Sequence, residues 1–415
     1  MLLIAAALVV TGALRYAPSC PALVPRAVTA DSATTGAFAT YGDGATTGPR
    51  WAGGDGTHSV RLPDGRTLWL FDDTLLGPVR PPDAAHPGTW SPPGSPAVAN
   101  SAVVRSAPRD GARLVRTIIG GTDPVRSWIP GEHDGGAWSW PVAGLVDTDD
   151  GRPVLRVLAH HTTSGRQQYV FGIGRYTVVR TYALPSLRLL GEVTLPIPRA
   201  GPGERVLYGT TTLADARYFY VYGNNTPADG RAAMYLARVP RGAVNRPDEW
   251  RYWDYGRWRR SPARARPVPA AHDDVASVST GFAVVRRGRT YVLFSMRTDP
   301  RVRGGIVGEI TASWACAPAG PWHGAYHVYT PPEAAGGGRT HTMIAYNPQA
   351  HPALATGGGV SLSYDLNDAA GMNGLANVKN DLSLYRPRFL NVRLGPPPAT
   401  SRAPGRGATR GSAHR

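Results

Sequence analysis

Residues 60–74 read VRLPDGRTLWLFDDT, two apolar segments joined by a short polar turn. Asp64 and Gly65 stand where a hairpin turn needs residues that tolerate a positive φ. Such a unit cannot bury both of its faces alone, so it must pack against its neighbours. The same pattern recurs in LVDTDDGRPVLRVLAHHT (145–162), YGTTTLADARYFYVYGNN (208–225) and FAVVRRGRTYVLFSM (282–296), and more weakly around GVSLSYDL (359–366).

The middle units also end alike, with a strand, a proline-bearing turn and another strand, as in ALPSLRLLGEVTLP (183–196). The 50 Gly and 39 Pro residues are spread along the chain, which suits short strands joined by tight turns. Four strands per unit and about five units predict an all-β chain folded as a single five-bladed β-propeller. The alternative is an irregular pair of β-sandwiches.

The first residues have the features of an export signal. The apolar stretch 2–14 is shorter than the about 20 residues that span a bilayer, and Val28-Thr29-Ala30 offers small residues for cleavage. We therefore predict a signal peptide over 1–30 and a secreted protein. An uncleaved membrane anchor and a lipoprotein modified at Cys20 are the alternatives. Cleavage after Ala30 would leave Cys316 alone, without an internal disulfide.

Composition divides the rest of the chain. Residues 31–50 are small and polar and predict a linker, residues 51–395 hold the repeats of the propeller domain, and residues 396–415 predict a disordered basic tail. We expect a monomer with no membrane contact beyond the signal peptide.

The charge and the motifs exclude several classes of function. The net charge is +16, and every basic residue except Lys379 is arginine, a bias typical of a high-GC coding sequence. Basic and aromatic residues do not alternate as in nucleic-acid-binding proteins, so we expect no nucleic-acid partner. The His residues are scattered, and phosphate-binding, dinucleotide and nucleophile-elbow motifs are absent, which predicts no metal and no cofactor.

Carboxylates are the better catalytic candidates. Asp55 lies between glycines in WAGGDGTHS, and Asp72 and Asp73 end an apolar strand, where alternation turns them to opposite faces. We predict that Asp73 faces inward. Two acids, one protonated and one ionised, can cleave a glycosidic bond. Glu309 is a reserve candidate and residues 272–274 (HDD) are secondary ones; a turn former and a strand-end cap are the structural alternatives for Asp55 and Asp73.

Aromatic and amide side chains predict the substrate contacts. Trp51, Trp138 and Trp140 lie in or beside loops, where their rings could stack on sugars. Asn100 and Asn225 are further substrate-binding candidates. The alternative for each Trp is packing between blades.

Several segments resemble one family in the same order. They are WAGGDGTHSVRLPDGRTLWLFDDTLLG (51–77), NSAVVRS (100–106), WSWPVAGLV (138–146), YGTTTLADARYFYVYG (208–223), YLARVP (235–240), PAGPW (318–322) and LSLYRPRFL (382–390). The family consists of secreted actinobacterial propellers, long catalogued as a domain of unknown function and similar to endo-D-arabinanases and to the wider arabinanase and β-fructosidase propellers. The resemblance implies that Asp55 and Asp73 line a central pocket.

One departure from the family concerns the second blade. Relatives carry an acid after a Trp-Pro pair, whereas this chain has Val142 and Ala143 after Trp140-Pro141. The predicted function is a secreted glycoside hydrolase that cleaves a furanose-rich polysaccharide such as arabinan. The missing acid keeps two alternatives open, a non-catalytic carbohydrate-binding propeller at the cell envelope and a purely structural surface protein.

Overall fold

Strands make up most of the computed structural model, and helices are few. The model describes residues 19–131, 136–163, 173–201, 204–225, 232–270, 277–298, 306–335, 343–355, 357–368 and 372–398. The predicted tail beyond residue 398, residues 1–18 of the predicted signal peptide and the candidates at 272–274 lie outside these ranges.

Five larger sheets, named I to V here, follow one another along the chain. Sheet I has the order β3-β4-β7-β8 (His58–Arg61, Thr67–Phe71, Ser101–Arg105, Leu114–Ile118). Sheet II has the order β11-β12-β13-β14 (Ala137–Asp149, Arg152–Thr163, Ile173–Ala183, Leu189–Thr194). Sheet III has the order β15 to β20 (Arg199–Gly201, Glu204–Ala214, Tyr218–Asn225, Met234–Pro240, Arg251–Asp254, Arg257–Arg259).

Sheets IV and V complete the series. Sheet IV has the order β21-β22-β23-β24 (Phe282–Arg287, Thr290–Thr298, Ile306–Ala315, His323–Tyr329). Sheet V has the order β25-β26-β27-β1 (Met343–Ala350, Val360–Asp368, Arg388–Gly395, Val24–Ala30), so its last strand comes from the other end of the chain.

The remaining elements are short. A three-stranded sheet joins β2, β5 and β6 (Trp51–Gly54, Thr74–Leu76, Ala97–Val98), and β9 pairs with β10 (Gly121–Thr122, Val125–Arg126). The helices are α1, α2 and α3 (Ser32–Asp43, Pro332–Ala335, Met372–Asn380), and the 3₁₀ turns are η1, η3, η4 and η6 (Pro108–Asp110, Pro247–Glu249, Pro262–Arg264, Leu382–Tyr385).

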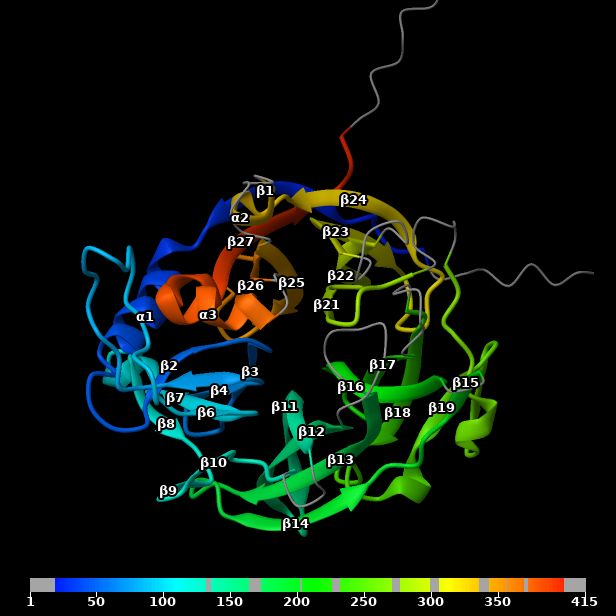
Figure 1. The fold of residues 1–415 in the computed structure, drawn as a ribbon. Coiled ribbons are helices and arrows are strands. Elements are labelled where there is room, and N and C mark those ends of the chain that lie inside the picture. Colours follow the sequence, from blue (N-terminus) through cyan, green and yellow to red (C-terminus); the bar gives the residue numbers. More distant parts are fainter. Residues whose placement is uncertain are drawn as a thin grey trace, which may run out of the picture.

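The sheets stand around a centre in chain order, and sheet V returns to lie beside sheet I (Figure 1). The first long strand of each sheet lies innermost, and β3, β11, β16, β21 and β25 contact one another in that sequence. Apolar clusters fill the junctions between successive sheets. The prediction of an all-β, propeller-like chain whose units bury their faces against neighbours is confirmed.

The junction of sheets I and II shows how the packing works. Leu68 and Leu70 of β4 are fully buried in one cluster with Leu155 and Val157 of β12. Each such side chain contributes about 1.5–3 kcal/mol when it leaves water. Gly144 permits the close approach of β11, because a Cβ there would stand 2.9 Å from Cγ1 of Val60.

The prediction of a linker over residues 31–50 is wrong in part, because residues 32–43 form helix α1. Asp31 caps the helix by accepting a hydrogen bond from the backbone N–H of Thr34 at 2.9 Å. Phe38 and Tyr41 then anchor it, since both side chains are buried in an aromatic cluster with Trp51. Two aromatic side chains therefore order a segment whose other residues are mostly small.

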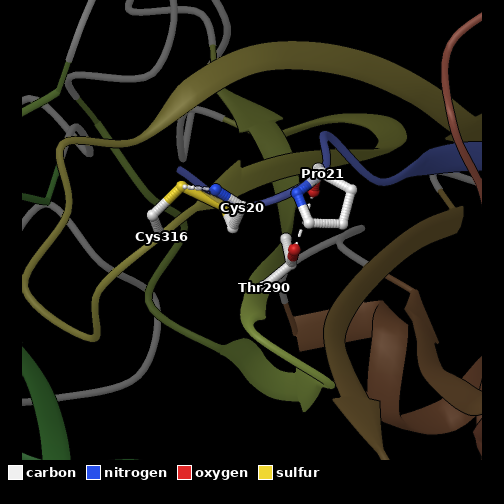
Figure 2. The surroundings of a disulfide bond; sticks show 4 residues. All are labelled: Cys20, Pro21, Thr290 and Cys316. Carbon is white, nitrogen blue, oxygen red and sulfur yellow. Dashed lines mark hydrogen bonds between the residues drawn. A yellow bond between two sulfur atoms is a disulfide. The ribbon is translucent and has the colours of Figure 1, made fainter. Parts of the chain in front are cut away.

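The predicted cleavage after Ala30 also conflicts with the structure. Strand β1 pairs with β27 from Val24–Gly395 to Ala30–Leu390 and supplies one edge of sheet V. Cys20 forms a disulfide with Cys316, so the expectation of a single unpaired cysteine is wrong. Figure 2 shows this bond beside Pro21, whose carbonyl accepts a hydrogen bond from the Thr290 hydroxyl at 2.7 Å. Residues 20–30 are thus built into the fold.

Candidate active site

Four aspartates gather where sheet I meets sheet V. Asp55 lies between β2 and β3, Asp72 and Asp73 connect β4 with β5, and Asp365 belongs to β26. Backbone hydrogen bonds hold the first two segments together: the N–H of Asp72 donates to the carbonyl of Asp55 at 2.8 Å, and the N–H of Asp55 donates to that of Asp73 at 3.3 Å. This pairing brings the carboxyl groups within electrostatic reach of one another.

Asp365 fastens sheet V to the segment that carries Asp55. Its Oδ2 accepts a hydrogen bond from the N–H of Gly56 at 2.8 Å, and its Oδ1 accepts one from the Thr57 hydroxyl at 2.6 Å. Burial raises the pKa of Asp365 to about 6, although these hydrogen bonds oppose the rise. Asp365 is therefore a positioning residue that also adds negative charge beside Asp55.

Asp55 is buried and held by two phenols. The Tyr346 hydroxyl donates to Oδ2 of Asp55 at 2.5 Å, and the Tyr385 hydroxyl also interacts with this carboxyl. Burial raises the pKa of Asp55 well above its usual value, and the charges of Asp73 and Asp365 add to the rise. Burial thus favours the protonated form of Asp55.

Asp72 lies against a glycine that makes room for it. Gly56 has φ +65°, and a Cβ at this position would stand 2.3 Å from Cγ of Asp72. Burial raises the pKa of Asp72 well above its usual value, followed by the charges of Asp55, Asp73 and Asp365. Its Oδ1 is buried without a hydrogen-bond partner in the described part of the chain, as expected for a carboxyl that keeps its proton.

Asp73 is the accessible member of the cluster. Its side chain is exposed, and its Oδ1 accepts a hydrogen bond from Nε1 of Trp140 at 3.2 Å. Protein atoms crowd it enough for desolvation to raise its pKa to about 6, against the effect of the Trp140 donor. Trp138 meets Trp140 edge to face with ring centroids 5.5 Å apart, so a second half-buried indole packs against the one that bonds Asp73.

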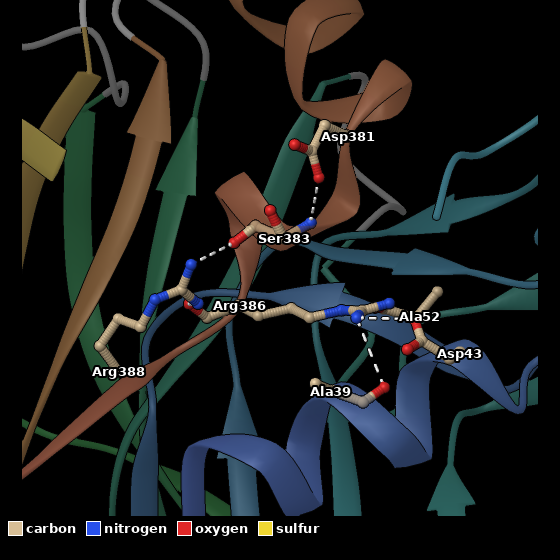
Figure 3. A network of polar contacts seen from close by, with 7 residues as sticks. All are labelled: Ala39, Asp43, Ala52, Asp381, Ser383, Arg386 and Arg388. Carbon is tan, nitrogen blue, oxygen red and sulfur yellow. Dashed lines mark hydrogen bonds and ion pairs between the residues drawn. The ribbon is translucent and has the colours of Figure 1, made fainter. Parts of the chain in front are cut away.

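An arginine behind the cluster fixes the strand that leads to Asp55. In Figure 3, Arg386 reaches from the segment between η6 and β27 to β2 and α1, and its Nε donates to the carbonyl of Ala52 at 2.8 Å. Its Nη1 also forms an ion pair with Asp43 at 2.9 Å. The neighbouring Tyr385 packs its carbonyl against Gly53, where a Cβ would approach to 2.8 Å. Arg386 therefore positions both Asp55 and the phenol that contacts it.

These environments separate the protonation states of the cluster. Asp73 titrates near pH 6, whereas Asp55 and Asp72 share a buried setting in which both cannot ionise together. The cluster thus combines a carboxyl with a pKa of about 6 and buried carboxyls whose raised pKa values favour protonation. This combination is what acid–base cleavage of a glycosidic bond requires.

The family comparison covers most of the chain. The sequence model described as "Domain of unknown function (DUF5005)" matches residues 39–394. The chain belongs to the DUF5005 family. The expected assignment to a family catalogued without a function is confirmed. No protein of curated function matches the sequence significantly.

A solved structure with a TM-score above 0.5 shares the fold of this DUF5005 protein, and two further structures resemble it more loosely. A protein from Bacteroides ovatus ATCC 8483, described as a "putative hydrolase", superposes with a TM-score of 0.65 and 18% identity, over 88% of this chain and 90% of the other. The native arabinanase Arb43A of Bacillus subtilis has a TM-score of 0.43, 9% identity, and coverage of 82% and 94%. A GH43_1 enzyme from Xanthomonas citri in complex with xylose has a TM-score of 0.43, 13% identity, and coverage of 87% and 93%.

The structure unites some of the predicted site residues and separates others. Asp55, Asp73 and Trp140 lie together, with Trp138 adjoining Trp140. Glu309 instead forms an ion pair with Arg297 at 3.1 Å in sheet IV and is not among the charges that act on the aspartates.

Three of the predicted substrate contacts are wrong, because their side chains are already used inside the protein. Trp51 is fully buried among aromatic rings. Asn100 is fully buried, and its amide bonds with the backbone of Ile129 and Ser139. Asn225 donates to Glu204 at 2.8 Å and accepts from the N–H of Ala233, which occupies its amide as well.

Sequence reasoning missed four members of the site. Asp72 was expected on the face opposite Asp73, whereas its carboxyl lies within electrostatic reach of both Asp55 and Asp73. Asp365 lies within the alternating sequence SLSYDL of β26. This alternation predicts a strand but does not indicate the hydrogen bond that Asp365 forms with distant Gly56. Tyr346 and Tyr385 resembled ordinary core residues.

Buried histidines near the site stay neutral. Burial lowers the pKa of His58 and His351 to about 3 and that of His160 to about 4. His351 bonds through its two ring nitrogens with Ser59 and Ser363, each at 2.8 Å. Within the described ranges, no group of three or more His, Cys, Asp or Glu side chains is arranged to hold a metal ion, and no helix is long and apolar enough to cross a membrane.

Proposed function

We propose that this DUF5005 protein is a glycoside hydrolase that cleaves a furanose-rich polysaccharide such as arabinan. The observation that carries the proposal is the aspartate cluster, in which an accessible carboxylate with a pKa of about 6 stands beside buried carboxyls whose pKa values burial raises well above their usual range. Carboxyl pairs with separated pKa values are the usual means of glycosidic-bond cleavage.

The environments suggest distinct roles for the acids. Asp73, which ionises first, acts as the base that takes a proton from the attacking water or as the nucleophile that attacks the anomeric carbon. Asp55, whose pKa burial raises, supplies the proton that the departing glycosidic oxygen receives. The indoles of Trp138 and Trp140 offer apolar faces to the sugar rings beside Asp73.

We interpret sheets I to V as the blades of one five-bladed propeller, with the aspartate cluster at one mouth of its central pocket. We further propose a secreted monomer whose partner is a polysaccharide. The Cys20–Cys316 disulfide supports export, because disulfides persist in oxidising compartments. It also argues against a lipoprotein, since the sulfur of Cys20 is already bonded.

A second candidate function is a carbohydrate-binding propeller without catalysis. Val142 and Ala143 stand where relatives carry an acid in the second blade, and both are apolar. In this case the polymer would bind beside Trp140 and remain uncleaved.

Activity of two asparagine variants tests the proposal. We expect Asp55→Asn and Asp73→Asn each to lower the release of reducing ends from arabinan by at least about 10²-fold, the usual scale for acid–base groups. Glu309→Gln is the matched control, because this acid is paired with Arg297, and it should change the rate by less than about twofold. Unchanged hydrolysis in both Asp variants would exclude these residues, and binding without hydrolysis by the parent would favour the second candidate.

A further inference from the structure

A basic pocket lies between sheets II and III, apart from the aspartate cluster. Its volume is about 560 Å³. The lining combines arginines with aromatic and apolar groups, and no lining residue is acidic. The residues used below are Arg175, Arg199 and Arg205 together with His161, Tyr176 and Ile197.

Two of the arginines oppose each other directly. Arg199 of β15 pairs with Arg205 of β16 across the antiparallel ladder. Like charges at facing positions destabilise a sheet. Neither guanidinium forms an ion pair within the described ranges, and Glu204, the acid next to Arg205, is bonded to Asn225 at 2.8 Å. An anion bound between the two arginines would relieve this repulsion.

The third arginine is held in place while part of it stays available. Nε of Arg175 donates to the Thr163 hydroxyl at 2.7 Å, and within the described ranges its two terminal amino groups have no hydrogen-bond partner. Beside it the rings of His161 and Tyr176 stack with centroids 4.6 Å apart and planes 12° apart. Ile197 adds an exposed apolar side chain. Aromatic rings next to a guanidinium group that is held in place suit a sugar ring that carries a negative charge.

The pocket and the aspartate cluster lie at the same end of sheet II. Trp140, which donates a hydrogen bond to Asp73, lies near the start of β11. Its neighbour Ser139 pairs with His161 of β12. His161 in turn pairs with Tyr176 of β13. One polysaccharide chain lying across this end of sheet II would meet both features. The net charge of +16 would also attract an acidic polymer to the protein.

We propose that this pocket is a binding subsite for an anionic group on a sugar, either the carboxylate of a uronic acid or a phosphate ester. The proposal rests on the proposed function in one respect, because it assigns to that substrate an acidic sugar at a distance from the cleaved bond. The opposed pair Arg199 and Arg205 binds the anion, and Arg175 adds a further donor.

Calorimetry with the full-length protein tests the subsite without any need for turnover. The probes are trigalacturonate, a glucose phosphate, and a neutral arabinan oligosaccharide, and the protein carries Asp73→Asn so that nothing is hydrolysed. We expect a charged probe to bind, and Arg199→Gln and Arg205→Gln each to weaken it at least about tenfold. Arg188→Gln is the matched control: it removes the same charge from an exposed residue in the turn at the other end of sheet II.

The outcomes separate this proposal from the proposed function. Preference for trigalacturonate assigns the carboxylate and preference for the sugar phosphate assigns the ester, and either supports the subsite if the pocket variants weaken binding and Arg188→Gln does not. Absence of binding by both charged probes, or equal loss in Arg188→Gln, overturns it. Failure of the parent to cleave arabinan would refute the hydrolase and leave this binding result untouched.

Discussion

Burial raises the pKa of Asp73, and the Trp140 hydrogen bond opposes this rise. An indole N–H that donates to a carboxylate stabilises the charged form, so Trp140→Phe should raise the pKa of Asp73 above about 6. If Asp73 acts ionised, the acid limb of kcat/KM should have its midpoint near pH 6 and move upward by about 0.5–1 unit in the variant. The measurement is a pH profile of arabinan cleavage by both proteins.

Trp138→Phe is the control for this shift, because its indole adjoins Trp140 without bonding Asp73. It should leave the midpoint unchanged even if KM rises. A midpoint near pH 6 on the alkaline limb instead would mean that Asp73 acts protonated, which reverses the assigned roles.

The raised pKa of Asp72 can be tested through the pH dependence of the free energy of unfolding. Its pKa is raised in the folded state, so the folded protein holds this proton more tightly than the unfolded chain does. The associated stability is present below the unfolded pKa of about 3.9 and is lost as pH rises through the folded pKa. We therefore expect Asp72→Asn to raise the free energy of unfolding relative to the parent by more at pH 8 than at pH 4, by about 1.4 kcal/mol for each pKa unit of the shift.

Urea unfolding at the two pH values measures this difference. Asp64→Asn should show the opposite trend, since the hydrogen bond from Arg66 lowers the pKa of Asp64 and stabilises its ionised form. An Asp72→Asn effect that is equal at pH 4 and pH 8 would contradict the buried-proton interpretation.

At the scale of elements, local rules in the sequence determined the hairpins. Gly65 and the pair Asp150-Gly151 have positive φ, as their turns require, so the strands on either side could be predicted. Helix α1 could not, because its stability comes from Phe38 packing on rings far away in sequence, such as Phe389. Long-range packing of this kind leaves no periodic signal within a short segment.

The candidate site, too, was predictable only where local sequence carries the signal. Asp55 and Asp73 were predictable because glycines and a strand end surround them in one repeat. Their partners were not, since Asp365 reaches Gly56 across more than 300 residues of sequence. The prediction of Trp51 as a substrate contact failed because a tryptophan beside a loop-like sequence can equally belong to a core. Here Trp51 contacts Phe38 and Phe71.

At the scale of the whole molecule, sheet V combines strands from widely separated parts of the chain. Strand β1 completes sheet V against β27, and the disulfide ties Cys20 to the end of β23 in sheet IV. Removing residues 1–30 would therefore delete one strand and one covalent link together. We expect export processing to occur on the N-terminal side of Cys20.

Mass spectrometry of secreted protein tests the position of that boundary, with the expected result that the mature chain retains Cys20 and holds Cys316 in a disulfide.

Thermal or urea unfolding of altered and shortened chains measures how much the disulfide and β1 contribute to stability. Cys20→Ala keeps β1 and should cost about 2–5 kcal/mol, the usual range for a lost native disulfide, because the crosslink restricts the unfolded chain across 296 residues. A chain that begins at Asp31 should lose more, since β1 also buries Val24 and pairs along its length with β27. If the Asp31 chain is instead the secreted form and unfolds at the same urea concentration as the longer one, neither β1 nor the disulfide is needed to close the ring.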